Sequence, residues 1–216
     1  DRIASWDRDL RVLLAELTES RTSEHTVTLP ISLSATQLMR LAADETGFAR
    51  ELARPMPRPP ATAARRGVRF HAWVESRFGQ QPLIVDDDLP GAADADIEDD
   101  ADLEALRAAF ERSEFAHRVP HAVEVPFHLI LGGRSVRGRI DAVYADADGR
   151  FTVVDWKTNR SQSADPLQLA IYRLAWAELH ALPLDEVRAA FVYVRTGATV
   201  LPDDLPDRSG LEALLA

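Results

Sequence analysis

The hydrophobic pattern changes from a helical period to a period of two at Ala122. Three apolar runs separated by turn residues follow: VEVPFHLIL, GG, RSVRGRIDAVY, ADADG and RFTVVDWKT. This order predicts three consecutive antiparallel strands, a meander. Asp165 and Pro166 then form an N-cap and first-turn pair, which predicts a helix in PLQLAIYRLAWAELHAL. The apolar run VRAAFVYVRT predicts a further strand inside the sheet.

The first half of the chain has apolar residues at helical spacing instead. The predicted segments are a helix at 2–20, an extended stretch at 26–33, a helix from the N-cap Ser34 through Leu41 toward Leu52 with a break near Gly47, a helix at 65–79, a loop at 86–96 and a helix at 102–115. Four prolines within residues 53–60 predict a connection that is not helical. The expected fold class is α/β (α+β): a central mixed sheet in the order β-β-β-α-β, with the helical N-terminal half packed around it.

Composition narrows the classes of function. The 216 residues contain no cysteine, which excludes disulfides, thiolate zinc sites, iron–sulfur clusters and cysteine nucleophiles. No run of about 18 apolar residues occurs, so no membrane span is expected. The first residues, DRIASWDRDL, lack an initiating methionine and a signal-peptide pattern, and we interpret the chain as a piece of a longer protein.

The net charge of −10, taken whole, argues against a nucleic-acid binder. The excess is local, because residues 84–104 hold ten acidic side chains and no basic one. Outside that window the acidic and basic side chains balance. The ordinary interpretation of the acidic window is a solvated loop.

Lys157 is the single lysine among 25 cationic side chains. Heavy use of arginine and alanine is typical of a GC-rich genome, which explains the arginines but not this lysine. Asp155 lies two residues earlier on the same predicted strand, so both side chains point to the same face. Asp141 lies on the preceding strand, and the ADADG turn brings it near Asp155.

Two carboxylates and an ammonium on one patch of sheet are costly to bury, and a hard divalent cation removes much of that cost. Carboxylate oxygens suit Mg²⁺ or Mn²⁺. A lysine ammonium is a compact charge that can orient or deprotonate a water, whereas a guanidinium is a planar fork. The alternative interpretation is a surface Lys–Asp pair without chemistry.

Five motifs in this order resemble the RecB-like branch of the PD-(D/E)xK nuclease superfamily: RGVRFHAWVE, VEVPF, GRIDAV, VVDWKT and QLAIY. The likeness covers residues 65–196. The stretch at 34–57 also resembles the lead-in to the C-terminal nuclease domain of bacterial, actinobacterial AddA/AdnA/AdnB-type helicase–nucleases. The resemblance implies a restriction-endonuclease-like core within a nuclease domain at 61–216, including the acidic loop region 84–104, after a helical lead-in segment at 1–60.

The resemblance also implies roles for the matched residues. The implied metal ligands are His71, Asp141, Asp155 and the main-chain carbonyl of Trp156, and the implied catalytic lysine is Lys157. Asp141 and Asp155 count among the catalytic residues as well.

Three further residues border the implied site. Gln168 and Tyr172 lie four apart on one helix face and match a pair beside the active site. Glu124 matches an acidic position on the first strand of the meander. Packing in the core stays open for Tyr172, and an ordinary strand position stays open for Glu124.

Basic and polar residues near these motifs are candidate DNA contacts: Arg65, Arg66, Arg69, Asn159 and Arg160. Arginine is common throughout this chain, so an ordinary surface role stays open for each. Gly138 is expected to relieve crowding between strands rather than to contact substrate.

The implied activity is hydrolysis of DNA phosphodiester bonds with one or two Mg²⁺ or Mn²⁺ ions and no iron–sulfur cluster. We expect single-stranded DNA, delivered by helicase motor domains in the same parent chain or a partner subunit, during double-strand-break repair and recombination. The expected location is the bacterial cytoplasm, at the nucleoid, with no membrane partner. The alternatives are a catalytically silent scaffold or DNA-guiding module, and a stand-alone RNA nuclease.

Overall fold

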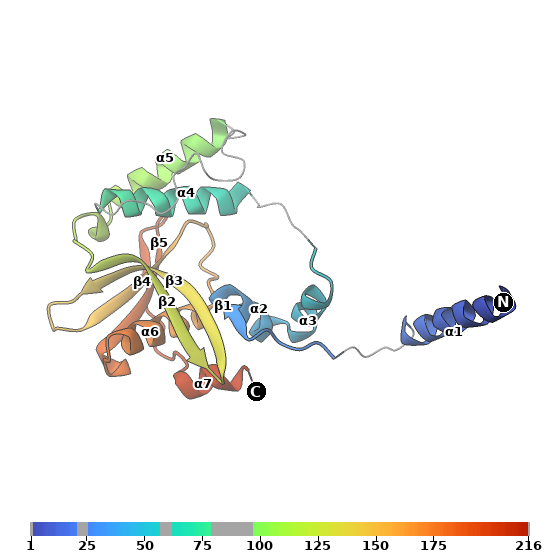
Figure 1. Cartoon of the computed structure of the whole chain (residues 1–216). Helices are drawn as coiled ribbons and strands as arrows, with labels where there is room; N and C mark the ends of the chain where they lie inside the picture. The colour runs from blue at the N-terminus through green and yellow to red at the C-terminus, as the bar shows by residue number, and fades with distance from the viewer. Residues whose placement is uncertain (1, 21–25, 57–61, 79–96, 216) are drawn as a thin grey trace.

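The structure is a computed structural model of the chain, and it describes residues 2–20, 26–56, 62–78 and 97–215. A sheet lies between helices on both of its faces (Figure 1). The described elements are α1 (Arg2–Ser20), β1 (Ser32–Ser34), α2 (Ala35–Ala43), α3 (Glu45–Ala53), α4 (Thr62–Arg77), α5 (Ile97–Glu111), a 3₁₀ turn (Glu114–Ala116), β2 (Ala122–Leu131), β3 (Arg134–Ala145), β4 (Phe151–Lys157), α6 (Pro166–Leu179), a second 3₁₀ turn (Leu184–Glu186), β5 (Val187–Tyr193), β6 (Ala198–Val200) and α7 (Arg208–Ala213).

The sheet is mixed, as predicted. Its order is β1-β3-β4-β5-β6, and β2 pairs with the other edge of β3. The strands β2, β3 and β4 form the predicted antiparallel meander, and β4 and β5 are parallel. Since β5 lies between β4 and β6, its predicted interior position is confirmed. The expected fold class is therefore correct.

Local sequence explains where the central elements begin and turn. The carboxylate of Asp165 accepts a hydrogen bond from the Leu167 amide at 2.9 Å, and Pro166 occupies the first turn of α6. Gly132 and Gly133 form the β2–β3 turn at φ values of +53° and +74°, which favour glycine.

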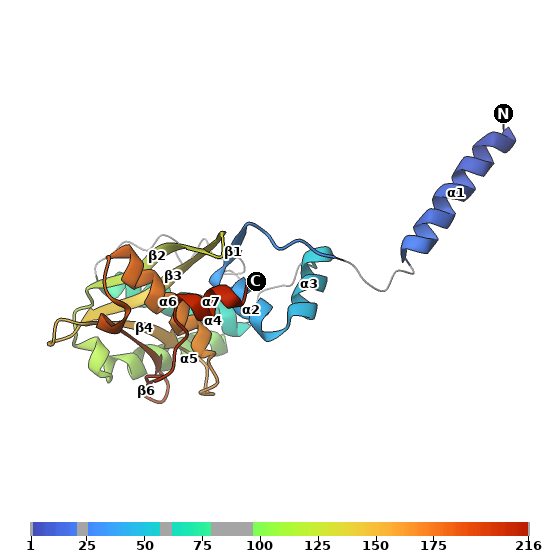
Figure 2. The same ribbon diagram turned by 90° about the horizontal axis from the view of Figure 1, so that it is seen from below.

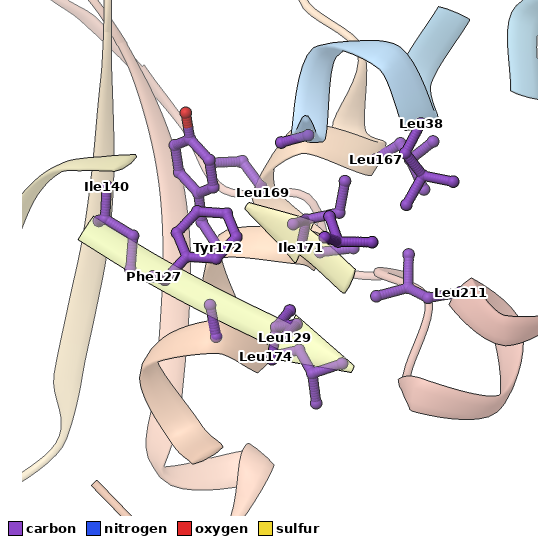
Figure 3. Close-up of a cluster of buried hydrophobic side chains, with 14 of the residues drawn as sticks. Leu38, Phe127, Leu129, Ile140, Leu167, Leu169, Ile171, Tyr172, Leu174 and Leu211 are labelled. Atoms are coloured by element: carbon purple, nitrogen blue, oxygen red, sulfur yellow. The ribbon is translucent and has the colours of Figure 1, made fainter. Parts of the chain in front are cut away.

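Two apolar clusters fix helices to the two faces of the sheet. The first cluster lies between the sheet and α2, α6 and α7, and Figure 3 shows some of its side chains. The second cluster joins α4 and α5 to the opposite face through Phe70, Phe110 and Trp156. Figure 1 shows α4 and α5 together, on the far side of the sheet from α6.

Gly138 relieves crowding between strands, as expected. It lies opposite Phe127 in the β2–β3 register, and a Cβ at Gly138 would come within 2.6 Å of the Phe127 ring. The missing side chain leaves room for that ring, which then packs against Tyr172 with the ring centroids 5.7 Å apart (Figure 3).

Several predicted helix boundaries were wrong. The break after α2 is at Asp44 rather than Gly47, because the Asp44 side chain caps the Gly47 amide at 2.8 Å and starts α3. The helix predicted at 65–79 is α4, which begins at Thr62 and ends at Arg77.

The prediction for the acidic residues at 84–104 was also wrong in part. The helix α5 begins at Ile97 rather than residue 102 and ends at Glu111 rather than residue 115. Residues 97–104 are therefore helical and not a solvated loop, because acidic side chains are favourable in the first turn of a helix. The loop predicted at 86–96 and the proline-rich residues 57–60 lie outside the described residues.

The predicted helix α1 is confirmed, and it stands apart from the sheet in both views (Figures 1 and 2). Its apolar stripe is exposed, with Trp6 at 66% and Leu13 at 61%. Among the described helices, none combines the length and apolarity that crossing a bilayer requires.

Candidate active site

The site lies in a fork between β3 and β4. Since β2 pairs along one edge of β3, both β1 and β4 must use its other edge. The strand β1 pairs with residues 135–137 and β4 with residues 142–145, so residues 138–141 lie between them. Asp141 is the first residue beyond the β4 pairing, and continuing that register places Asp155 opposite it.

Side chains from both faces of the sheet reach this fork. The reason lies in β2, whose buried side chains point to one face before Glu124 and to the other face after it. Val123 belongs to the second cluster, whereas Phe127 belongs to the first, although residues an even number apart should share a face. The change falls at Glu124, whose φ of +50° is unusual for a residue with a side chain. Such positions cost free energy and are concentrated at functional sites.

Three of the converging side chains form a group that could hold a metal ion. His71 comes from α4, Glu124 from β2 and Asp141 from β3, and their ligand atoms all lie within 4.8 Å of one another. His71 Nδ1 is 3.4 Å from Glu124 Oε1 and 3.6 Å from Asp141 Oδ2. The β2–β3 register places the two carboxylates side by side, where they repel each other. One imidazole and two such carboxylates fit Mg²⁺ or Mn²⁺.

The protonation of this group follows from its burial and charges. Burial alone would lower the pKa of His71, but the carboxylates of Asp141 and Glu124 raise it to about 9. Burial raises the pKa of Asp141 to about 7, against the opposing effect of His71. The group therefore carries protons near neutral pH that a metal ion must displace.

A second group surrounds Lys157. Lys157 Nζ lies 2.8 Å from Asp155 Oδ2 and donates to Gln168 Oε1 at 2.6 Å. Gln168 Nε2 donates to Asp155 Oδ1 at 2.6 Å and to the Tyr172 hydroxyl at 3.0 Å. Gln168 thus links α6 to β4, and its side-chain amide holds both the Asp155 carboxylate and the Lys157 ammonium.

Burial sets the charge of this second group as well. Burial raises the pKa of Asp155, against the opposing effect of Lys157. Burial also raises the pKa of Tyr172, so its hydroxyl stays protonated. Tyr172 is 7% exposed and packs on Phe127, so it is both a core residue and a member of this group.

The two groups meet at Asp141, whose Oδ2 accepts a hydrogen bond from the Trp156 amide at 2.9 Å. Asp155 lies beside the three-residue group rather than within it, with both oxygens toward Lys157 and Gln168. Its role as a metal ligand, and that of the Trp156 carbonyl, stay predictions. The Trp156 indole packs in the second cluster.

The candidate DNA contacts occupy varied environments. Arg66 NH1 lies 2.8 Å from Asp102 Oδ2, so it is held by α5. Arg65 and Arg69 are half-buried on α4, and Arg160 is exposed. The Asn159 side-chain Nδ2 donates to the Ser161 main-chain carbonyl at 2.9 Å within its own turn. Binding of DNA by these residues stays a prediction.

Sequence reasoning missed two charged residues at the site. Glu75 and Arg139 line a cavity of about 350 Å³ together with His71, Glu124 and one face of α4. Arg139 NH1 is 3.5 Å from Glu124 Oε2, and Glu75 is 6% exposed. The spacing held a signal for both, since Glu75 lies one helical turn after His71 and Arg139 lies two residues before Asp141.

Comparison with known families decides what this arrangement belongs to. The family model of the PD-(D/E)XK nuclease superfamily matches residues 32–212, which include both groups. The chain belongs to the PD-(D/E)XK nuclease superfamily. The match begins at β1 and also covers α2 and α3.

Other proteins resemble this superfamily member over different lengths. Gene 69 proteins of Mycobacterium phages L5 and D29 are each 36% identical over 81 residues, which is 38% of this chain. These residues span only 27% and 29% of the phage proteins. The crystal structure of a candidate exonuclease from Eubacterium rectale matches with a TM-score of 0.59 at 13% identity, over 85% of this chain and 76% of that one. At this identity the last likeness supports the fold alone.

Proposed function

We propose that this chain is a metal-dependent nuclease domain that hydrolyses phosphodiester bonds of DNA. The observation that carries the proposal is the meeting of a His–Glu–Asp group with an Asp–Lys–Gln group in the fork between β3 and β4. Superfamily membership supports the same reaction class.

The residues of the fork would have different roles in this reaction. His71, Glu124 and Asp141 would hold the divalent cation, with Asp155 beside them. A bound cation supplies positive charge and Lewis acidity at the scissile phosphate. The Lys157 ammonium would lie next to the scissile phosphate. There it would orient the attacking water and offset the negative charge that develops on the phosphate. Gln168 keeps Lys157 and Asp155 in place through its two hydrogen bonds.

The finer proposal concerns delivery of the substrate. A domain with a net charge of −10 attracts DNA weakly on its own. We therefore propose that helicase motor domains, in the parent chain or a partner subunit of the AddA/AdnA/AdnB type, bring a single strand to the fork. This assignment rests on the motifs and the lead-in at 34–57, and it would place the protein in double-strand-break repair at the bacterial nucleoid. The division into a lead-in at 1–60 and a nuclease domain at 61–216 is part of this proposal.

The test is cleavage of end-labelled single-stranded DNA with Mg²⁺ or Mn²⁺. We expect the wild-type chain to cut, and Asp155→Asn and Lys157→Arg each to lower the rate by a factor of about 10² or more, because both act on the reacting group. Arginine retains the charge at position 157 but places it on a wider planar group. The matched control is Asp148→Asn, which changes a half-exposed carboxylate in the β3–β4 turn and should cut normally.

Equal cutting by the wild type and Asp155→Asn would indicate a contaminating nuclease and favour the silent scaffold. The scaffold has no specific support, because Asp141, Asp155 and Lys157 are all present. Competition between DNA and RNA substrates would distinguish a DNA nuclease from the alternative of an RNA nuclease.

A further inference from the structure

A partly buried ion pair lies at the end of β5, just beyond the fork. Arg195 follows β5, and its guanidinium donates to both carboxylate oxygens of Asp102 on α5, at 2.6 and 2.7 Å. Its Nε donates to the main-chain carbonyl of Thr158 at 2.7 Å. The Arg195 side chain is 13% exposed. A bidentate charged pair of this kind combines strength with a fixed orientation.

Asp102 connects this pair to the helix that carries His71. Arg66 of α4 lies 2.8 Å from Asp102 Oδ2, so one carboxylate holds two guanidinium groups from different elements. The pKa of Asp102 is lowered, mainly by the hydrogen bonds from Arg195, so this carboxylate stays charged. The junction therefore joins α4, α5 and the ends of β4 and β5.

The junction contacts the main chain one residue after Lys157. Lys157 is the last residue of β4, and its carbonyl accepts a hydrogen bond from the Val194 amide at 3.0 Å. The next carbonyl, that of Thr158, is the one held by Arg195. The pairing between β4 and β5 ends at Lys157. The Arg195 side chain therefore restrains the main chain at Thr158, where the sheet no longer does.

We propose that Arg195 is a positioning residue for the reaction: held by Asp102, it fixes the main chain after Lys157 and thereby the place of the lysine ammonium in the fork. The proposal rests on the role given to Lys157 above. It also assigns a task to an acidic residue of the 84–104 window and to Arg66, which sequence reasoning had given to DNA. Asp102 already pairs with the guanidinium groups of Arg66 and Arg195. This pairing argues against a direct contact between Arg195 and a DNA phosphate.

The test uses Arg195→Lys, since lysine retains the charge opposite Asp102 but lacks the planar fork that also reaches Thr158. The matched control is Arg188→Lys near the other end of β5, where Arg188 NH2 pairs with Asp148 at 2.8 Å on the surface. We expect Arg195→Lys to lower kcat for single-stranded DNA by a factor on the order of ten to a hundred with KM unchanged, because small misplacements of a reacting group are costly. Arg188→Lys should behave as the wild type.

A second readout does not depend on activity. Because Lys157 is the only lysine, selective labelling with ¹⁵N-lysine gives one main-chain amide resonance that reports its position. This resonance should shift or split in Asp102→Asn, which loosens the same junction without adding a lysine, but not in Asp148→Asn, which changes the surface partner of Arg188. If the wild type does not cleave, the function proposed above fails and the resonance alone decides the positioning.

Two results would overturn the proposal. One is an unshifted Lys157 resonance in Asp102→Asn together with an unchanged kcat in Arg195→Lys. The other is a raised KM with kcat unchanged, which would make Arg195 a DNA contact instead.

Discussion

At the scale of single residues, His71 and Asp141 hold protons more tightly than such side chains ordinarily do. With its pKa raised to about 9 by the neighbouring carboxylates, His71 keeps its proton at neutral pH, and burial raises the pKa of Asp141 so that this carboxyl also takes up protons more readily than an exposed one. Both pKa values lie above the ordinary ones, so a metal ion must displace these protons, and fewer remain to be displaced as pH rises. Metal affinity should therefore increase with pH up to about pH 9.

This pH dependence can be measured by calorimetric titration of Mg²⁺ at pH 6.0, 7.0 and 8.5 in buffers of different ionisation enthalpy. We expect roughly tenfold tighter binding per pH unit for each proton displaced. His71→Gln should leave a shallower slope, because one of the two protons is then missing. A flat pH profile would show that these two groups are not metal ligands.

At the scale of elements, the β2–β3 pair is built around a missing side chain. Gly138→Ala places a methyl group against the Phe127 ring and should destabilise the fold by about 1–3 kcal/mol. Gly67, inside α4, is the opposite case, since the nearest atom to an added Cβ is 3.6 Å away. Gly67→Ala should stabilise the fold by about 0.5–1 kcal/mol. Urea unfolding measures both, and equal effects of the same sign would contradict this packing.

Element types could be predicted from the sequence, but several boundaries could not. The meander and α6 follow from period-two runs, glycine turns and the Asp165–Pro166 pair, which are local signals. The start of α5 was missed because an acidic run is typical both of solvated loops and of helix N-termini, and only its docking through Asp102 and Arg195 distinguishes them. The short strand β6 and helix α7 were not predicted, because little in their own sequence distinguishes them from a loop.

At the scale of the whole molecule, the sheet brings together side chains that lie far apart in the sequence. His71 and Tyr172 come from helices on opposite faces, and they meet at the fork because β3 and β4 separate there and β2 changes face at Glu124. Motif matches named most of these residues in advance. They could not indicate that Glu124 stands with His71 and Asp141, or that Gln168 holds Lys157, because both depend on strand register and on an unusual φ.

The most direct test is a crystal of this chain soaked in Mn²⁺ and measured for anomalous scattering. We predict a peak among the side chains of His71, Glu124 and Asp141, with Lys157 on the adjacent side of the fork. A crystal at saturating Mn²⁺ with an empty fork, or with the ion bound only elsewhere, would contradict the account.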